Sequence, residues 1–426
     1  MAEGELVIRG GEVVDATGRR RADVLVRDGV VVEVGQGLDA RRVLDADGCV
    51  VAPGLVDLHT HLREPGREEA ETVETGARAA ALGGYTAVVA MPNTEPAIDS
   101  AGVVRQVLEA GARSCCDVRV AGAITVDRAG TRLAPMAEMA ELGVRIFTDD
   151  GRGVQDARLM RRALEYASAL GVVLAQHCED EALAAGGHMH EGEWSSRLGI
   201  PGIPSEAEEL MVMRDIALAR LTGARVHFQH LSTAGSVAMV GAAKAQGLPI
   251  TAEATPHHFT LTAAEVASYD PVFKVNPPLR TPADVAAVRE GLAAGVFDAI
   301  ATDHAPHAQE AKEAPFDEAP PGMLGLETAL SLALTELDLP IEQVLALCSW
   351  QPARVAGLNG QHGGPVTEGF PANLCVIDTA ATWVVEPERL ASRSRNTPYG
   401  GRKLTGRVRH TLLRGEPVVA DGVAQR

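Results

Sequence analysis

The sequence predicts an α/β fold: a (β/α)8 TIM barrel with a small β-sandwich domain built from both chain ends. Three observations lead to this prediction. Apolar strands alternate with alanine-rich helical segments through the middle of the chain, which is typical of parallel β/α architecture. Eight such strands can be counted, the number that closes a barrel. Short β segments without a helical period occupy both ends.

Residues 1–53 are expected to form the N-terminal part of the β-sandwich. The segments ELVIRG, GEVVDA, ADVLVRDGVVVEVG and CVVAPG are separated by Gly and Asp turn residues. β-like segments return after about residue 365, as ANLCVIDTA, TWVVE and GRVRHTLLRGEPVVADG. We therefore expect residues 365–426 to pair with the N-terminal segments and to complete one sandwich beside the barrel.

Residues 54–364 are expected to form the barrel. Helical periodicity predicts helices over residues 68–82, 156–170 and 205–221, and the charges of the first helix are expected to form a solvated face. The predicted strands lie near residues 55–61, 85–91, 117–124, 144–149, 172–177, 225–231, 249–255 and 298–303.

The composition is that of a soluble globular protein. Hydrophobic residues make up 46% and charged residues 23%, and no apolar run approaches the roughly 20 residues of a membrane span. The N-terminus MAEGELVIRGG has no secretory signal pattern, so we expect a cytoplasmic protein. The net charge of -18 argues against nucleic-acid and membrane partners. Six scattered cysteines without C-x-x-C spacing are expected to be buried, reduced packing residues.

A pair of histidines ends the first barrel strand. Strand alternation places His59 and His61 on one face, where two imidazoles can bind one metal ion. The alternative is a pair of hydrogen-bonded core histidines. Their position favours the metal site, because sites in this fold assemble at the C-terminal ends of the strands.

Four further residues of ligand type end other strands. Each of Asp150, His177, His230 and Asp303 follows a different strand. Nitrogen and carboxylate ligands without thiolate suit Zn²⁺ best, with Mn²⁺ or Co²⁺ as substitutes.

Other candidates are weaker. His188 and His190 lie in a Gly-rich segment outside any predicted strand, and we do not expect them to bind metal. One residue of the pair His257 and His258 could border the pocket. Cys178 is expected to pack in the core.

Several short runs are similar to those of bacterial class I dihydroorotases, members of the amidohydrolase superfamily, and the resemblance covers essentially the whole chain. It implies the reversible, zinc-dependent cyclisation of N-carbamoyl-L-aspartate to L-dihydroorotate in de novo pyrimidine (UMP) biosynthesis. The runs are DLHTHLREPG (57–66), MPNT (91–94), FTDDG (147–151), HCED (177–180), TPHH (255–258), KVNPPLR (274–280) and ATDHAPH (301–307).

The resemblance also implies ligand roles. One zinc would be held by His59, His61 and Asp303, a second by His177 and His230, with Asp150 rather than Asp149 as the bridge, which gives two zinc ions per subunit. Many relatives use a carboxylated lysine as the bridge. No lysine lies between the first-strand histidines and Lys244, so this chain has only an aspartate to offer there.

The implied mechanism follows from the ligands. In hydrolysis, a metal-bound hydroxide attacks the ring amide and the catalytic Asp303 carries the proton to the departing nitrogen. The resemblance assigns substrate binding to further residues: the carboxylate to Arg63, Asn93 and His307, the ring amide to Asn276, and the pyrimidine edge to the backbone of Pro321 and Gly322. Residues 308–321 form either a mobile cover or a solvated loop.

Non-functional roles are the alternatives for this segment. Arg63 would then form a surface salt bridge, and residues 64–66 would be an ordinary turn. For the whole chain, one alternative is a cyclic amidase of the hydantoinase or dihydropyrimidinase type. Another is a catalytically silent homologue that serves as a scaffold for aspartate carbamoyltransferase. We expect a homo-oligomer that acts on a small-molecule substrate, and association with that transferase is left open by the sequence.

Overall fold

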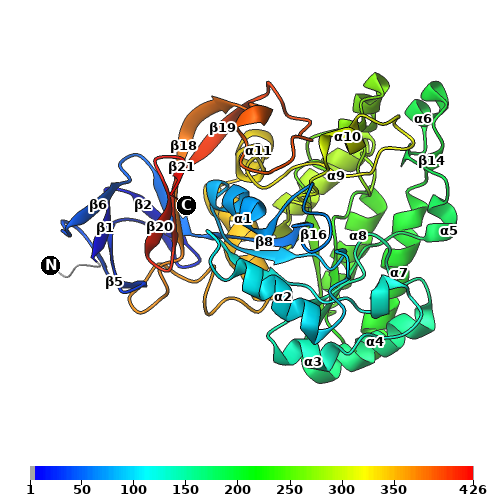
Figure 1. Ribbon diagram of the computed structural model, residues 1–426, viewed down its shortest axis with the longest axis horizontal. Helices are drawn as coiled ribbons and strands as arrows, with labels where there is room; N and C mark the ends of the chain where they lie inside the picture. Colours follow the sequence, from blue (N-terminus) through cyan, green and yellow to red (C-terminus); the bar gives the residue numbers. More distant parts are fainter. Residues whose placement is uncertain (1–4, 426) are drawn as a thin grey trace.

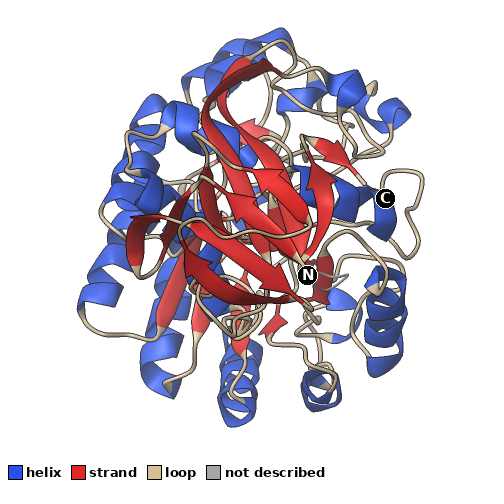
Figure 2. Ribbon diagram, turned by 90° about the vertical axis from the view of Figure 1, so that its left-hand side faces the viewer, coloured by secondary structure: helices blue, strands red, loops and turns tan. Residues whose placement is uncertain are grey.

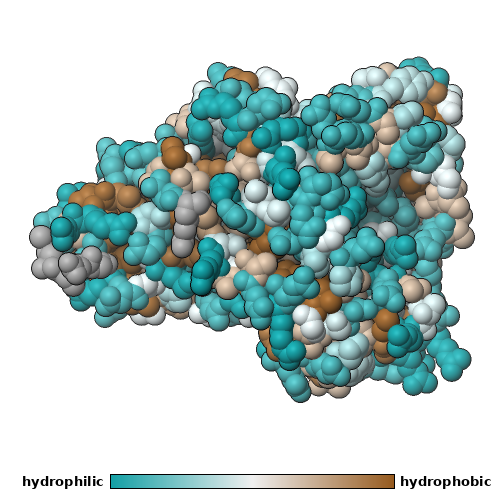
Figure 3. Space-filling model, viewed as in Figure 1, coloured by the Kyte–Doolittle hydropathy of each residue, from teal (hydrophilic) through white to brown (hydrophobic). Residues whose placement is uncertain are grey.

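The computed structural model describes residues 5–425; residues 1–4, the start of the predicted N-terminal β unit, and residue 426 lie outside the described residues. Strands from both chain ends, blue and red in Figure 1, lie together on one side of the molecule, beside a larger β/α part. None of the helices within residues 5–425 is long and apolar enough to cross a membrane. Hydrophilic residues dominate the face shown in Figure 3, with apolar residues scattered among them.

Eight parallel strands form the centre of the β/α part, each where the sequence predicts a strand. They hydrogen-bond in chain order in two sheets, one of three strands and one of five. The strands are β8 (Leu55–Thr60), β9 (Tyr85–Ala90), β10 (Asp117–Val120), β11 (Ile146–Phe147), β12 (Val173–Gln176), β15 (Val226–Phe228), β16 (Ile250–Ala254) and β17 (Ala299–Ile300).

Single parallel bridges connect the two sheets at both seams. Gly122 bridges Phe147, and Thr60 bridges His304. The backbone N–H of His61 also donates to the carbonyl of His304 at 2.8 Å. Below this seam the buried carboxylate of Asp57 accepts hydrogen bonds from the backbone and side chain of Thr302, at 2.9 and 2.6 Å. The first and last strands are therefore tied together directly beneath the C-terminal ends of the strands.

The helices surround these strands (Figure 2). They are α1 (Val73–Leu82), α2 (Ala101–Gly111), α3 (Met136–Glu141), α4 (Ala157–Leu170), α5 (Glu181–Ala184), α6 (Glu193–Leu198), α7 (Glu206–Thr222), α8 (Ala234–Ala245), α9 (Pro282–Ala293), α10 (Gln309–Lys312), α11 (Ala329–Glu336), α12 (Ile341–Leu345) and α13 (Gln351–Val355).

Helix α1 begins later than predicted. Thr72 is its N-cap, and the side chain of Thr72 accepts a hydrogen bond from the backbone N–H of Thr75, which fixes the start of the helix. The expectation of a solvated charged face is wrong for Glu71, which is buried and contacts His304 and Ser392. Helices α4 and α7 match their predicted ranges, because Asp156 caps α4 at its start and left-handed glycines end both helices.

The interior of the β/α part consists mainly of alanine and other aliphatic residues. One apolar cluster joins residues of β8, β9, β11, β12, β17 and α13, including Val56, Leu58 and Ala87. A larger cluster packs the outer faces of the strands against the helices. The predicted burial of the cysteines is confirmed, since all six are buried.

The two chain ends build two further sheets. One has the order β21-β20-β19-β18-β7-β2-β3 and contains strands from both ends, because β7 pairs with β18. The other has the order β5-β4-β1-β6, and one apolar cluster includes residues of both sheets. The strands are β1 (Leu6–Arg9), β2 (Glu12–Asp15), β3 (Gly18–Arg21), β4 (Asp23–Arg27), β5 (Val30–Gly35), β6 (Arg42–Asp45), β7 (Val50–Pro53), β18 (Leu374–Val384), β19 (Lys403–Leu413), β20 (Glu416–Ala420) and β21 (Val423–Ala424).

Strands β18 and β19 are long enough to leave this unit and reach the β/α part. Their far ends lie beside α11 (Figure 1), where the indole N–H of Trp383 donates to Ser331 at 3.1 Å. A smaller correction concerns His190, which was expected outside any strand. It belongs to the short strand β13 (Met189–His190), which pairs with β14 (Gly202–Ile203).

Candidate metal centre

Six side chains predicted as ligands meet at the C-terminal ends of the parallel strands. All six are buried. His59 lies in β8, and the others lie one to three residues beyond the ends of their strands: His61 after β8, Asp150 after β11, His177 after β12, His230 after β15 and Asp303 after β17.

His59 and His61 face the same space. Nε2 of His59 lies 3.3 Å from Oδ1 of Asp150, and Nε2 of His61 lies 3.5 Å from Oδ2 of the same carboxylate. The other ring nitrogen of each histidine, Nδ1, is hydrogen-bonded to a neighbouring side chain. His59 Nδ1 lies 2.7 Å from Glu253 Oε1, and His61 Nδ1 lies 2.8 Å from Asn93 Oδ1. Such partners fix the orientation of the ring and leave Nε2 free to bind a cation.

Asp150 is shared by two groups of possible ligands. His59, His61 and Asp150 form one group and Asp150, His177 and His230 the other, with the ligand atoms of each group within 4.8 Å of one another. Nδ1 of His177 and Nε2 of His230 lie 2.9 Å apart.

Asp303 lies beside the first of these groups. Its Oδ1 is 3.1 Å from Nε2 of His61 and 3.6 Å from Nε2 of His59. The structure thus brings all six predicted residues together.

The electrostatics of the site favour a cation. Burial alone lowers the pKa of His59, but the carboxylates of Asp150 and Asp303 outweigh burial and hold that pKa well above its usual value. Burial likewise raises the pKa of Asp150, yet the surrounding histidines hold it well below its usual value. The pKa of Asp303 is also lowered, against burial, by His59 and His61. Both aspartates therefore stay ionised at neutral pH.

The donor atoms fit a metal ion. Nε2 of His59 is buried and has no hydrogen-bond partner within residues 5–425, and buried polar atoms without partners are costly. A cation would satisfy this nitrogen and also the facing nitrogens of His177 and His230. Imidazole nitrogen and carboxylate oxygen are ligands that proteins use for transition-metal ions. The buried His/Asp groups could therefore hold metal.

Three residues around the site have left-handed backbone conformations. The φ angles are 63° for Arg63, 33° for His230 and 45° for Asp303. Non-glycine residues with positive φ are uncommon, and such conformations are concentrated at functional sites. Each of the three lies two or three residues beyond the end of its strand, at the edge where the site forms.

A cavity of about 210 Å³ opens onto the possible ligands, and all six residues predicted to bind the substrate line it. These residues are Arg63, Asn93, Asn276, His307, Pro321 and Gly322. Arg63 is buried, so the alternative of a surface salt bridge is wrong. Its Nε donates to the carbonyl of Pro306 at 3.0 Å, which orients the guanidinium towards the cavity.

Two of the predicted substrate contacts touch each other. Nε2 of His307 donates to the carbonyl of Pro321 at 2.8 Å, and Nη2 of Arg63 lies 3.4 Å from the same nitrogen. Burial and the Arg63 guanidinium lower the pKa of His307 to about 2, so the ring is neutral in this structure. Nδ1 of His307 has no partner among the described residues and is the atom left for a ligand.

The amide groups of Asn93 and Asn276 have separate surroundings. Oδ1 of Asn93 faces His61, which leaves its amide N–H groups for a ligand. Nδ2 of Asn276 lies 3.3 Å from Glu179 Oε1, while Oδ1 of Asn276 is buried without a partner in the described chain. Asn276 thus offers a free acceptor for an amide N–H.

Residues 308–321 contain the short helix α10 and are anchored by Lys312. Its Nζ donates to the carbonyls of Pro271 and Pro320, at 2.9 and 2.8 Å. Pro320 and Pro321 line the cavity. The segment is thus packed against its neighbours, and its end forms part of the cavity wall.

Glu253 is a residue of the site that sequence reasoning missed. It lies in β16, with Oε1 at 2.7 Å from His59 Nδ1 and Oε2 at 3.0 Å from His227 Nε2. Burial raises the pKa of Glu253, but the two histidines reverse this effect and lower it to about 2. A glutamate among the apolar residues of the predicted strand ITAEA was the available signal.

Asn396 was also missed, and it supports the cavity from the C-terminal region. Its side chain donates to the carbonyls of Ala305 and Gly322, at 3.0 and 3.1 Å, and accepts from the N–H of His307 at 3.2 Å. No short-range pattern connects Asn396 with these residues.

Asp149 and His258, two of the weaker candidates, form hydrogen bonds with neighbouring protein groups. Asp149 accepts hydrogen bonds from the backbone N–H groups of Ile124 and Thr125, at 2.9 and 3.0 Å. His258 bonds to Thr255 and to the carbonyl of Pro277. Cys178 is buried, as predicted. The remaining weaker candidates, His188, His190 and His257, belong to neither group of possible ligands found in the described chain.

Comparisons with known proteins agree with this geometry. A family model described as dihydro-orotase-like matches residues 48–236. A dihydroorotase of Streptomyces coelicolor is 53% identical over 426 residues, which cover 98% of each chain. A dihydroorotase of Pelotomaculum thermopropionicum is 49% identical, over 98% of this chain and 99% of the other. One of Mycobacterium tuberculosis is 50% identical over 412 residues, 94% of this chain and 96% of the other.

Solved structures with a similar fold include hydantoinases. An L-hydantoinase (dihydropyrimidinase) from Arthrobacter aurescens has a TM-score of 0.87 and 25% identity, and the match covers 99% of this chain and 97% of the other. A D-hydantoinase (dihydropyrimidinase) from a Thermus species has a TM-score of 0.85 and 25% identity, over 98% and 96% of the chains.

Proposed function

The chain belongs to the dihydroorotase family of the amidohydrolase superfamily, and on this premise we propose that it performs its reaction at a two-zinc centre bridged by Asp150. The enzyme interconverts N-carbamoyl-L-aspartate and L-dihydroorotate in pyrimidine biosynthesis. The observation that carries the proposal is that Asp150 belongs to both groups of buried ligand atoms.

The proposed ligands divide between the two sides of Asp150. His59, His61 and Asp303 would hold one ion, and His177 and His230 would hold the other. The nitrogen and oxygen donors suit Zn²⁺, and Mn²⁺ or Co²⁺ can substitute. When bound, the ions lower the pKa of a water molecule to about 7 and polarise the carbonyl oxygen of the substrate.

Asp303 moves the proton. In hydrolysis its carboxylate accepts the proton of the attacking water and delivers it to the ring nitrogen that departs. This role is supported by the place of Asp303 on the cavity wall beside His61 and by its ionised state at neutral pH, in which the carboxylate has an oxygen available for a proton. In the direction of synthesis, the same group takes the proton back from the nitrogen.

The substrate is oriented by the far wall of the cavity. Arg63 and an N–H of Asn93 bind the ring carboxylate, and Oδ1 of Asn276 accepts from the ring amide. His307 joins them through Nδ1, since an anion beside the ring stabilises the imidazolium. The backbone of Pro321 and Gly322 borders the pyrimidine edge.

The proposed architecture is a closed (β/α)8 barrel over residues 54–364, with residues 1–53 and 365–426 as one β-sandwich. The parallel bridges at both seams support closure of the barrel. The apolar cluster shared by the two terminal sheets supports the sandwich.

A cyclic amidase of the hydantoinase type is the second candidate, because similar solved structures carry that name. It is the weaker one. The sequence relatives at about half identity are dihydroorotases, and the cationic Arg63 suits a substrate that carries a carboxylate.

Chelation of the isolated chain tests the zinc proposal. Exhaustive removal of metal should abolish dihydroorotate hydrolysis, and two equivalents of Zn²⁺ per chain should restore it. Metal content is measured on the same samples. Full activity in metal-free protein would refute the mechanism.

A further inference from the structure

Residues 391–396 lie between β18 and β19 in the sequence and end beside the cavity of the candidate metal centre. The last of them, Asn396, is buried. Its Nδ2 donates to the carbonyls of Ala305 and Gly322, at 3.0 and 3.1 Å, and its Oδ1 accepts from the backbone N–H of His307 at 3.2 Å. A single amide group therefore joins two separate stretches of chain, one around residue 306 and one around residue 321.

These two stretches carry most of the groups assigned above to the carboxylate and the pyrimidine edge. The first contains His307 and also Pro306, whose carbonyl accepts from Nε of Arg63 at 3.0 Å. The second contains Pro321 and Gly322, which line the cavity together with Arg63 and His307. The relative position of the two stretches therefore determines how these groups face a substrate.

The two stretches fit closely against each other. Nε2 of His307 donates to the carbonyl of Pro321 at 2.8 Å. Gly322 has a φ of 140°, and a Cβ atom there would lie 2.7 Å from the Cβ of Ala305 and 2.8 Å from Nε2 of His307. Only a glycine allows this approach, so a shift of either stretch would disturb the cavity wall.

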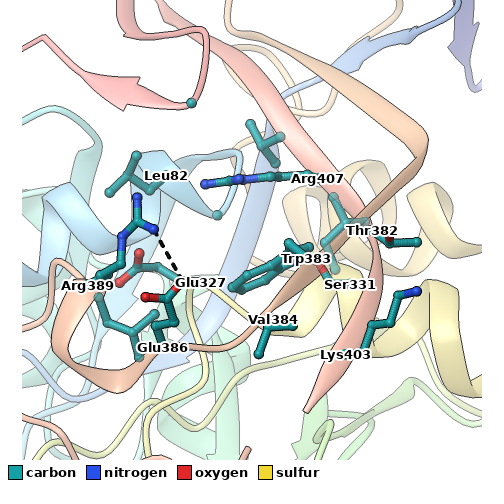
Figure 4. A pocket seen from close by; sticks show the side chains of 15 residues that line it. Leu82, Glu327, Ser331, Thr382, Trp383, Val384, Glu386, Arg389, Lys403 and Arg407 are labelled. Carbon is teal, nitrogen blue, oxygen red and sulfur yellow. Dashed lines mark hydrogen bonds and ion pairs between the residues drawn. The ribbon is translucent and has the colours of Figure 1, made fainter. Parts of the chain in front are cut away.

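The segment 391–396 is itself fixed by two buried carboxyl groups. Glu327, labelled in Figure 4, lines a second cavity of about 540 Å³ and accepts from the N–H of Ala391 at 2.7 Å. Glu71, which precedes α1, accepts from the N–H of Arg393 at 3.0 Å. The amide at the end of the segment therefore meets the cavity wall from an anchored position.

We propose that Asn396 is a positioning residue of this enzyme. Its amide holds the two stretches so that Arg63 and His307 meet the substrate carboxylate while the backbone of residues 321 and 322 borders the ring. Asn396 acts through these groups, because it does not itself line the cavity. The inference rests on the proposed function, since it concerns a substrate that carries a carboxylate.

Variants of Asn396 in the zinc-loaded full chain test the proposal. Asn396→Ala leaves three backbone groups without their partner, so KM for dihydroorotate should rise by about 10-fold or more. The reacting groups are untouched, so kcat should change less than about threefold and metal content should not change. Asn396→Asp keeps the shape and the acceptor but loses the Nδ2 donors, and it should raise KM in the same way.

Asn373→Ala is the matched control. Asn373 is also buried and also joins two stretches of backbone, since Nδ2 donates to the carbonyl of Gln361 at 2.8 Å and Oδ1 accepts from the N–H of Arg414 at 2.6 Å. It does not line the cavity of the metal centre. This variant should lower Tm as Asn396→Ala does, but KM should stay within about twofold of the parent value.

The outcomes separate this inference from the proposed function. If the parent chain hydrolyses dihydroorotate and both Asn396 variants keep KM within about twofold, the positioning role alone is overturned. Equal increases of KM in Asn396→Ala and Asn373→Ala would overturn it as well, as would failure of both Asn396 variants to fold while Asn373→Ala folds. A zinc-loaded parent chain without dihydroorotate hydrolysis would instead overturn the proposed function, and this inference with it.

Discussion

Asp303 and Asp150 are both buried carboxylates of the candidate metal centre, yet they are placed for different tasks. Both line the cavity, but Asp150 lies between the two histidine groups, whereas Asp303 approaches His61 and His59 at 3.1 and 3.6 Å. The difference suggests a bridge in the first case and a proton carrier in the second. Substitutions at the two positions should therefore fail in different ways.

Asp303→Asn should keep the fold and at least one metal ion while turnover falls by about 10² to 10⁴, the usual contribution of general acid-base transfer. Asp150→Ala should instead lose one or both ions. Metal analysis and kcat for dihydroorotate, measured on the same samples, distinguish the two effects. Near-normal turnover of Asp303→Asn would assign proton transfer to another group.

Glu253 is a positioning residue of the candidate metal centre. Its carboxylate is hydrogen-bonded to His59, which it orients, and to His227. Glu253→Gln keeps the shape but removes the charge that holds the tautomer of His59. Metal affinity should fall by about 10- to 100-fold, as is usual when such a partner is changed. Competition with a chelating dye measures the affinity, and Glu74→Gln, at an exposed position of α1, serves as the matched control. An unchanged affinity would show that Glu253 only fills space.

At the scale of elements, residues 308–321 connect α10 with the cavity wall. Lys312 donates to carbonyls on both sides of this segment and thereby holds Pro320 and Pro321 in place. Lys312→Met should raise KM for dihydroorotate several-fold and leave metal content unchanged, since the cation touches no possible ligand. Steady-state kinetics measure the effect. A change in kcat alone, with normal KM, would contradict a role of this segment in substrate binding.

The strands and their ends could be predicted from the sequence because the signals are local. Apolar runs mark all eight parallel strands, and the ligand-type residues that follow them come together because parallel strands end at one edge. Long-range contacts were not predictable. Helix α1 starts at Val73 because Thr72 caps it, and the burial of Glu71, just before this cap, depends on contacts with His304 and Ser392, far away in the sequence. The contact between His307 and Pro321 depends in the same way on tertiary packing.

At the scale of the whole molecule, the candidate metal centre connects five of the eight parallel strands, since its residues end β8, β11, β12, β15 and β17. A ligand that binds only the folded state stabilises it by mass action, by about 2.7 kcal/mol at a concentration 100 times Kd. Zn²⁺ should therefore raise the Tm of the metal-free chain, measured by calorimetry, whereas Asp150→Ala should show a much smaller increase.

This stabilisation should depend on pH in a defined direction. Zn²⁺ needs neutral imidazoles, and the carboxylates around His59 raise its pKa in the metal-free site, so protons compete with the metal. Because the pKa of His59 is raised above the usual histidine value of about 6.5, the Tm increase should begin to decline above that pH and should fall further as the solution becomes more acidic. An increase that is the same at pH 5.5 and pH 8 would contradict histidine ligation.

The central claim is that this chain is selective for a substrate carrying a carboxylate, and catalytic efficiency on dihydroorotate, dihydrouracil and hydantoin tests it most directly. Donors placed for an anion are left unpaired by the neutral rings, so kcat/KM should be far higher for dihydroorotate. In Arg63→Met the preference should fall by about 2 to 5 kcal/mol, the usual cost of a broken buried charge pair, with metal content unchanged. Equal efficiency of the parent chain on all three rings, or an unchanged preference in Arg63→Met, would contradict the account and favour a hydantoinase.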